Sequence, residues 1–307
     1  MPPGINSWIY EGKGRAPSLA WSVATEAPLV ALEYARETGD LLAADESGTL
    51  SRIDPTGRVS NVTQARTPVR GLAWSDTGAG GAVLVDQTKL YWFDERLRFT
   101  SSAELPGRTS AVAIESQARY VAVALSDGLV VIHDPNRKVV RHFDAGQPFV
   151  RMRFLLDQPA IVGVAEYGLL ACHHFEGDRI WVEKLFSGVG DMAITGDGKA
   201  VLLACFAMGV QCHRRDGAHL GSYQLGGTVN RVATSFVSKR IGAATIERHV
   251  FWLDTDGDVL WQGEAPDEVF ALHCDPLGRG LIAGLKSGRI VRMDWERPTA
   301  SDNAAGS

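Results

Sequence analysis

Residues 110–143 of this chain have the sequence SAVAIESQARYVAVALSDGLVVIHDPNRKVVRHF. Short apolar segments occupy residues 110–114, 120–125, 129–133 and 138–143, and polar, turn-forming residues separate them. The second segment, YVAVAL, is apolar almost throughout, as expected for a strand that is buried on both faces. Segments of this length bounded by Asp, Asn, Gly and Pro are typical of β-strands. The stretch therefore predicts four consecutive strands.

The same arrangement recurs every 40 residues along most of the chain. Aliphatic residues occupy one position of the repeat in seven successive copies: Leu50, Leu90, Val130, Leu170, Val210, Val250 and Ile290. A turn position holds aspartate in most copies: Asp54, Asp94, Asp134, His174, Arg214, Asp254 and Asp294. A unit of this size cannot bury its own apolar face, so neighbouring units must stack. Because no segment keeps helical periodicity, the sequence predicts an all-β repeat protein.

Four-stranded units of about 40 residues, repeated four to eight times, are typical of a β-propeller. The seventh unit lacks a fourth strand, because its expected position falls in the polar segment at residues 298–307. A spare strand, SLAWSV, lies at residues 18–23, before the first unit. We therefore predict a seven-bladed propeller whose N-terminal strand completes the last blade and leaves no open edge. The expected parts are an N-terminal arm (1–16), the propeller (17–297) and a flexible tail (298–307).

Over residues 17–297 the chain resembles the WD-repeat-like propellers in repeat length, strand plan and closing strand. Pairs such as Ile53-Asp54 and Phe93-Asp94 stand where that family has Trp-Asp, and its Gly-His pair is absent. A propeller nearer the quinoprotein-like group fits the same repeat. A quinone-binding propeller would need a tryptophan docking motif in every blade, which this sequence lacks, so no cofactor is expected. The resemblance implies a rigid platform that binds a protein or peptide on one rim.

Charge and cysteine content limit the classes of partner and the compartment. The formal net charge of -5 provides no basic field, so neither nucleic acid nor a membrane surface is expected as a partner. No apolar run approaches the roughly 18 residues of a membrane span. The four cysteines lie in apolar, strand-like segments, which favours free buried thiols in a reducing compartment: Cys172, Cys205, Cys212 and Cys274. We therefore expect a cytoplasmic protein.

Two clusters raise the question of a metal. His133, His173 and His213 share one position in three successive repeats. Equivalent positions in neighbouring sheets lie about 10 Å apart, whereas zinc ligands lie about 2.0–2.3 Å from one ion. Residues 254–258, DTDGD, alternate carboxylates around a glycine, but they occupy the usual turn position and lack the following glutamate of a calcium loop. We therefore predict buried histidines, a turn and no metal.

The expected binding rim consists of the loops that enter the innermost strands and the loops between the second and third strands. Four large apolar residues fall on this rim among charged ones: Phe149, Tyr167, Met208 and Phe270. Aromatic and methionine anchors with polar surroundings are typical of protein-binding sites. Packing between blades is an equally good explanation for Phe149 and Phe270.

Charged residues are expected at the mouth of the central channel. Arg151, Asp191 and Arg231 share one position of the innermost strand in three successive repeats, and Arg70 and Arg153 lie close to it. Innermost strands surround the propeller axis, so these side chains should gather there. One interpretation is an Arg–Asp–Arg ion ring assisted by Glu33. The other is an anion site in which guanidinium groups receive a carboxylate or a phosphate.

These observations favour a non-enzymatic scaffold that binds a protein or peptide partner on the rim. No catalytic motif is present, and no catalytic residue is predicted. The alternative is a propeller enzyme or small-ligand binder that uses polar groups in the central funnel. A weaker possibility is a sensor domain detached from a larger signalling chain. A scaffold and an enzyme would differ in that an enzyme needs a deep polar pocket with a perturbed titratable group.

Overall fold

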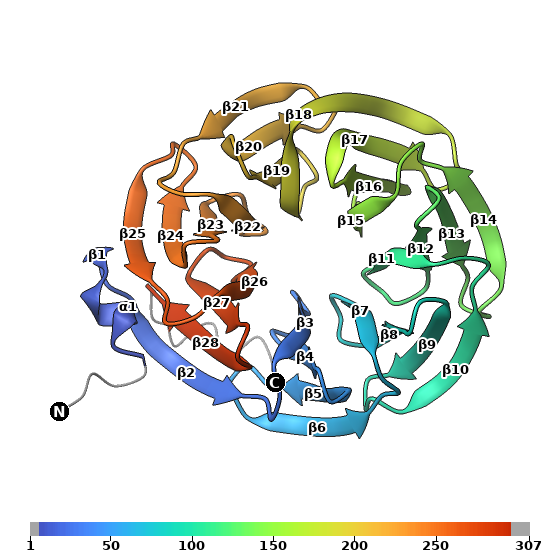
Figure 1. The fold of residues 1–307 in the computed structure, drawn as a ribbon, viewed down its shortest axis with the longest axis horizontal. Coiled ribbons are helices and arrows are strands. Elements are labelled where there is room, and N and C mark those ends of the chain that lie inside the picture. The colour runs from blue at the N-terminus through green and yellow to red at the C-terminus, as the bar shows by residue number, and fades with distance from the viewer. Residues whose placement is uncertain (1–5, 296–307) are drawn as a thin grey trace.

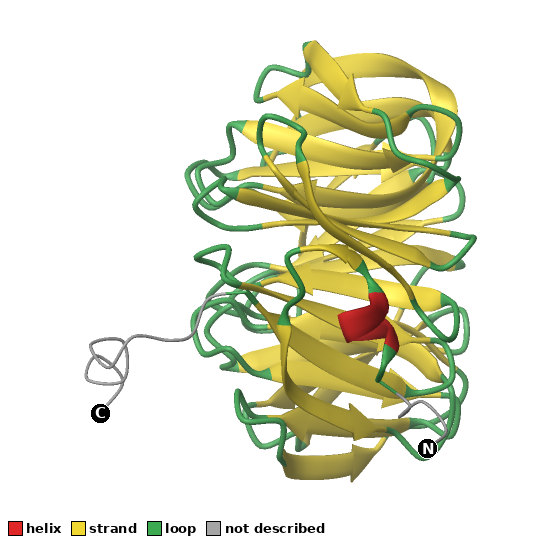
Figure 2. Ribbon diagram, turned by 90° about the vertical axis from the view of Figure 1, so that its left-hand side faces the viewer, coloured by secondary structure: helices red, strands yellow, loops and turns green. Residues whose placement is uncertain are grey.

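The computed structural model describes residues 6–295, which form a ring of seven antiparallel sheets around a central axis (Figure 1). Each sheet is one blade of a β-propeller, with its first strand next to the axis and its fourth at the circumference. Figure 2 shows the ring from the side as a thick disc. No helix within residues 6–295 is long and apolar enough to cross a membrane.

The strands of the first three blades follow one another along the chain. Blade 1 consists of β3 (Leu29–Tyr34), β4 (Leu41–Asp45), β5 (Thr49–Ile53) and β6 (Val59–Gln64). Blade 2 consists of β7 (Val69–Trp74), β8 (Gly80–Val85), β9 (Lys89–Asp94) and β10 (Phe99–Glu104). Blade 3 consists of β11 (Thr109–Ile114), β12 (Val121–Leu125), β13 (Leu129–His133) and β14 (Val139–Asp144).

Blades 4 and 5 share one long strand, β18 (Arg179–Ile194), which is outermost in blade 4 and innermost in blade 5. Blade 4 also contains β15 (Phe149–Phe154), β16 (Ala160–Ala165) and β17 (Tyr167–His174). Blade 5 continues with β19 (Ala200–Cys205), β20 (Gly209–Arg214) and β21 (His219–Tyr223). The repeat predicts a loop between these blades, but the chain there remains extended.

The last two blades are joined to the N-terminal segment. Blade 6 consists of β22 (Val229–Thr234), β23 (Arg240–Thr245), β24 (His249–Asp254) and β25 (Val259–Glu264), with β1 (Lys13–Gly14) added at its edge. Blade 7 consists of β26 (Val269–Cys274), β27 (Gly280–Leu285) and β28 (Arg289–Asp294), and its fourth strand is β2 (Ser18–Ala24). The prediction of seven blades closed by an N-terminal strand is confirmed.

The closing strand is also fixed to blade 1 by Trp21. Its indole Nε1 donates a hydrogen bond to the carbonyl of Pro55 at 3.0 Å. Gly57 has a φ of +85°, and a Cβ there would lie 2.6 Å from Trp21 Cγ. The turn therefore needs glycine both for its left-handed conformation and for the approach of the indole.

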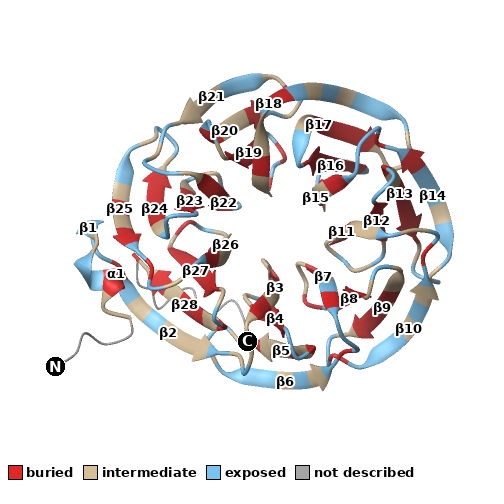
Figure 3. Cartoon of the chain, in the orientation of Figure 1, coloured by how far each residue is buried: buried red, intermediate tan, exposed pale blue. Residues whose placement is uncertain are grey.

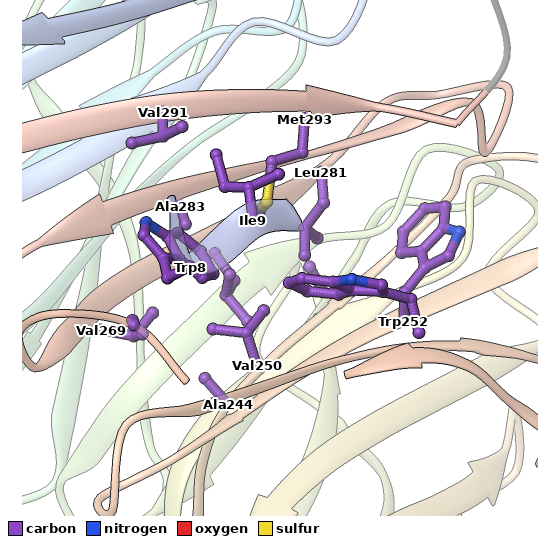
Figure 4. Packing of buried hydrophobic residues seen from close by; sticks show 14 of the residues in the cluster. Trp8, Ile9, Ala244, Val250, Trp252, Val269, Leu281, Ala283, Val291 and Met293 are labelled. Atoms are coloured by element: carbon purple, nitrogen blue, oxygen red, sulfur yellow. The ribbon is translucent and has the colours of Figure 1, made fainter. Parts of the chain in front are cut away.

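The N-terminal arm packs on the outer side of blades 6 and 7 rather than extending into solvent. Helix α1 (Trp8–Glu11) contributes Trp8, which is 6% exposed, and Ile9, which is fully buried, whereas Tyr10 is 57% exposed. Trp8 lies 6.0 Å from Trp261, centroid to centroid. Figure 4 shows Trp8 and Ile9 among apolar side chains of the neighbouring strands. The predicted tail at residues 298–307 lies outside the described residues.

The apolar core lies between the blades, because each sheet is covered by its two neighbours (Figure 3). The second strands β4, β8, β12, β16 and β27 are buried at every residue. The repeated aspartates cap the hairpin turns: Asp54 Oδ1 accepts the backbone N–H groups of Thr56 at 2.9 Å and Arg58 at 3.0 Å. Asp254 accepts those of Asp256 and Asp258 in the same way, as expected of a turn.

Candidate binding surface and funnel

Every innermost strand contains a β-bulge next to the residue at which its pairing with the second strand of the blade begins. In β7, for example, Val69 pairs with Val85 and Gly71 with Leu84, so Arg70 is the extra residue between them. The corresponding register shift occurs in the other six innermost strands. A bulge re-aims side chains because two residues then oppose one on the partner strand. Two consecutive residues of each strand can therefore face the axis.

The axis is occupied by a cavity of about 280 Å³ that all seven innermost strands line. It brings together seven of the residues named from the sequence: Glu33, Arg70, Arg151, Arg153, Asp191, Arg231 and Phe270. Arg151, Asp191 and Arg231 share one position of the repeat. The other four blades have small residues at that position: Ala31, Gly71, Ala111 and Ala271. Blades 4 to 6 therefore fill the upper funnel with charged side chains, and blades 7 and 1 to 3 leave space opposite them.

The expected ion ring is only partly formed. Arg151 Nε lies 3.2 Å from Asp191 Oδ1. The other carboxylate oxygen of Asp191 accepts the backbone N–H of Val232 at 3.3 Å. Arg231 makes no direct ion pair within residues 6–295 and donates instead to the backbone carbonyls of Phe270 and Asn230. Asp191 therefore neutralises Arg151 by direct contact and Arg231 only at longer range.

Phe270 separates two cations at the upper mouth of the funnel. The guanidinium carbon of Arg231 lies 5.7 Å from the centre of the Phe270 ring, and Lys286 Nζ lies 5.2 Å from it. Both distances are within the range of cation–π attraction. Burial lowers the pKa of Arg231, and the nearby charge of Arg151 lowers it further, although the charges of Asp191 and Glu268 oppose both effects.

Deeper in the funnel, an ion pair crosses the axis. Arg153 Nη1 in blade 4 lies 3.0 Å from Glu33 Oε2 in blade 1. His273 from blade 7 lines the same level, and its Nε2 lies 2.9 Å from the carbonyl oxygen of Leu32. Glu33, which was expected to help neutralise Arg151 and Arg231, therefore pairs with Arg153 instead. The lining of the cavity continues past this pair to Arg36 and Asp76.

An apolar group of side chains lies on the upper face, the face on which the chain enters each innermost strand. Phe186 is 89% exposed, Tyr167 is 65% exposed and Met208 is 40% exposed. Phe206 is half-buried beside them. These four residues, which we call the blade 4–5 patch, come from the first position of β17, the middle of β18 and the β19–β20 turn.

Backbone contacts fix the blade 4–5 patch. Phe206 N–H donates to the carbonyl of Gly188 at 3.0 Å, and Tyr167 pairs with the same glycine. A Cβ on Gly188 would lie 3.0 Å from Phe206 Cδ2 and 3.1 Å from Tyr167 Cε1. Both rings therefore meet over Gly188, and glycine is what allows them to approach. Gly190 admits Phe206 in the same way and adjoins Asp191, so the patch reaches the funnel mouth.

Phe149 does not lie on the rim; of the two explanations that the sequence left open, packing between blades is the correct one. Its side chain is fully buried between blades, and a Cβ on Gly163 would lie 2.3 Å from its ring. The bulge between Phe149 and Arg151 reverses the alternation that would place both on the same side. Phe270, expected on the rim or between blades, lines the funnel next to the corresponding bulge of β26.

Two aromatic residues of the patch were missed from the sequence, although a signal was present. At the repeat position of Phe186 the other copies have Glu26, Arg66, Pro106, Gly146, Gly226 and Pro266. At the position of Phe206 most copies have polar or charged residues: Glu46, Asp86, Ser126, Glu166 and Lys286. A large aromatic residue at a loop position that is otherwise polar marks a departure from the repeat, and a comparison across copies would have found both.

The in-register histidines lie apart, each against its own neighbours. His133 packs against Trp92, His173 stacks on Phe143 at 4.3 Å, and His213 Nδ1 lies 2.9 Å from the carbonyl oxygen of Gly217. Within residues 6–295 no group of three or more His, Cys, Asp or Glu residues is placed to hold a metal ion.

Seven four-stranded blades and an N-terminal closing strand define a WD-repeat-like β-propeller. Among solved structures, the β-propeller domain of Cps50 (Swd1) from Myceliophteria thermophila is similar to this chain, with a TM-score of 0.77 and 15% identity. The match covers 91% of this chain and 100% of that one. A scan against protein-family models and a search of curated proteins found no match. At this identity, the similarity shows the fold.

Proposed function

We propose that this protein is a non-enzymatic scaffold that binds a protein or peptide partner through the blade 4–5 patch. The observation that carries the proposal is the meeting of Tyr167 and Phe206 over Gly188. Phe186, two residues before Gly188, and Met208, two residues after Phe206, are both exposed. Single exposed apolar residues are ordinary on protein surfaces, whereas a contiguous group of large ones is typical of an interaction site.

The composition and the setting of the patch suit a docking site. Tyr, Phe and Met are enriched in the cores of protein interfaces, and charged residues usually surround them. Lys184 Nζ lies 5.8 Å from the Phe186 ring, and Glu166 is exposed beside Tyr167. The backbone beneath the patch is held in two paired sheets, so little ordering is needed on binding. We infer a partner that places an aromatic or aliphatic side chain against Tyr167 and Phe206.

A peptide-display selection tests this function. Random twelve-residue peptides would be selected on the immobilised full-length protein, and their affinities would be measured for the parent, Tyr167→Ser, Phe186→Ser and Leu277→Ser. Leu277 is a matched control, because it is 48% exposed and follows the innermost strand β26 on the opposite face. All three side chains are exposed, so the substitutions should leave folding intact.

The proposal predicts selected peptides rich in aromatic or aliphatic residues whose affinity falls at least tenfold, about 1.4 kcal/mol, in Tyr167→Ser and Phe186→Ser. Leu277→Ser should bind as the parent does. Peptides that bind all variants equally, or that lose affinity only with Leu277→Ser, would show that the patch is not the binding surface.

A further inference from the structure

The upper funnel contains more positive charge than its own carboxylates neutralise by contact. Arg70, Arg151 and Arg231 line it together with the single carboxylate Asp191. Asp191 contacts Arg151 directly. The deeper charges Glu33 and Arg153 neutralise each other and add no net charge. Among the described residues, two guanidinium groups in one cavity are thus left without a carboxylate in contact.

Those two arginines differ in how they are held. Arg231 is fixed by donation to two backbone carbonyls and by the face of Phe270. Arg70, the bulge residue of β7, makes no hydrogen bond or ion pair with any residue that the structure describes, and its side chain is exposed to the funnel. It is therefore available to a ligand.

Ser110 provides a second polar group without a partner. It is the bulge residue of β11, next to β7 in the ring, and it lines the same cavity as Arg70. Its hydroxyl oxygen is buried and makes no hydrogen bond in the described structure. Buried polar groups nearly always have a partner, and each exception calls for an explanation such as a ligand or water. Rotation about the Cα–Cβ bond of Ser110 would turn the hydroxyl toward the cavity, where it can donate to an oxyanion.

We propose that the upper funnel binds an oxyanion, a carboxylate or a phosphate group, held by Arg70 and Arg231 with Ser110 as an additional donor. Guanidinium groups recognise both anions through paired hydrogen bonds. Ala31, Gly71, Ala111 and Ala271 leave the space for it at the upper end of the axial cavity, which has a total volume of about 280 Å³.

This site shares no residue with the blade 4–5 patch, so the two proposals can fail independently. The anionic group can belong to a free small molecule or to an acidic side chain of a docked partner. Calorimetric titrations at constant ionic strength would therefore use inorganic phosphate, succinate, and a tetrapeptide with two aspartates and both ends blocked. A matching titration with sodium chloride measures the unspecific screening of charges by added salt.

The decisive variants are Arg70→Gln and Ser110→Ala, with Arg66→Gln as the matched control. Arg66 is exposed four residues earlier in the same chain segment and does not line the cavity. Arg70 holds no contact in the described structure, so its substitution should not alter the melting temperature.

The proposal predicts saturable binding that weakens at least tenfold in Arg70→Gln, weakens less in Ser110→Ala and is unchanged in Arg66→Gln. Binding of phosphate or succinate identifies a free small anion as the ligand, and binding of the tetrapeptide alone identifies an acidic side chain. The proposal is overturned if none of the three probes binds saturably, or if Arg70→Gln and Arg66→Gln bind equally well.

Discussion

Glu33 and Arg153 form a salt bridge across the axis of the ring, with 3.0 Å between Oε2 and Nη1, although 120 residues separate them in the sequence. Glu33 belongs to β3 in blade 1 and Arg153 to β15 in blade 4, and the two strands lie on opposite sides of the central opening (Figure 1). The pair connects two blades that share no sheet edge.

Breaking this pair should destabilise the ring. Removing one member of a buried pair costs about 3–5 kcal/mol, but the Arg153 side chain is 43% exposed to the funnel, so we expect about 1–3 kcal/mol for Glu33→Gln or Arg153→Gln. Urea unfolding of both single variants and the double variant would give a coupling energy of about 1 kcal/mol. A coupling near zero would mean that the pair contributes nothing to closing the ring.

The N-terminal arm should contribute measurably to stability through Ile9. Ile9 is fully buried against blades 6 and 7, so Ile9→Ala should lower the free energy of unfolding by about 2–4 kcal/mol. The neighbouring Tyr10 is 57% exposed, and Tyr10→Ala should change it by less than about 0.5 kcal/mol. Deletion of residues 1–24 would also remove β2 and expose the edge of β28 to aggregation. Equal effects of the two substitutions would contradict the docked arm.

Stability should fall as the pH is lowered through the range in which free histidine titrates. Burial lowers the pKa of His133, His173, His213 and His273. The unfolded chain therefore takes up protons near pH 6.5 that the folded chain takes up only at lower pH. The stabilisation is fully present above that pH and is lost as the pH falls.

Chemical unfolding at pH 7.5 and 5.5 measures this effect. Each histidine can contribute up to about 1.4 kcal/mol per pH unit. His173→Phe keeps an aromatic ring against Phe143 and should reduce the difference between the two pH values. A parent protein that is equally stable at both would show that these histidines titrate normally.

Gly57 should be intolerant of a side chain. Its φ is +85°, and a Cβ there would lie 2.6 Å from the indole of Trp21, so we expect Gly57→Ala to cost about 1–3 kcal/mol. Gly226→Ala is the control, because a Cβ there meets no atom within 4 Å. The melting temperatures of the two variants should differ by several degrees. Identical melting temperatures would show that the contact between Trp21 and Gly57 does not stabilise the closed ring.

The ring could be predicted from the sequence because its unit repeats at a constant spacing. Aliphatic positions such as Leu50 and Leu90, and the capping aspartates, occur once in each copy and need only local interactions to be recognised. The closing strand was predictable because a strand is missing after β28 and a matching one precedes β3. These features follow from the chain alone, without knowledge of distant contacts.

The candidate site was predicted less completely, because it depends on pairing between strands. The bulges cannot be seen in the sequence, and they decide that Phe149 is buried while Arg70 and Phe270 reach the funnel. The Glu33–Arg153 pair depends on the diameter of the closed ring. Phe186 became part of a surface patch because β18 stays extended where other blades have a loop. Each of these depends on the assembled structure.

Site-specific photo-crosslinking tests the central claim, protein binding at the blade 4–5 patch, most directly. A photoreactive phenylalanine analogue would replace Phe186 in the full-length protein, and Leu277 in a parallel control, in the cells that produce the protein. The account predicts discrete protein adducts from position 186 that disappear when Tyr167→Ser is added, and none from position 277. Adducts from position 277 alone, or adducts from position 186 that persist with Tyr167→Ser, would contradict it.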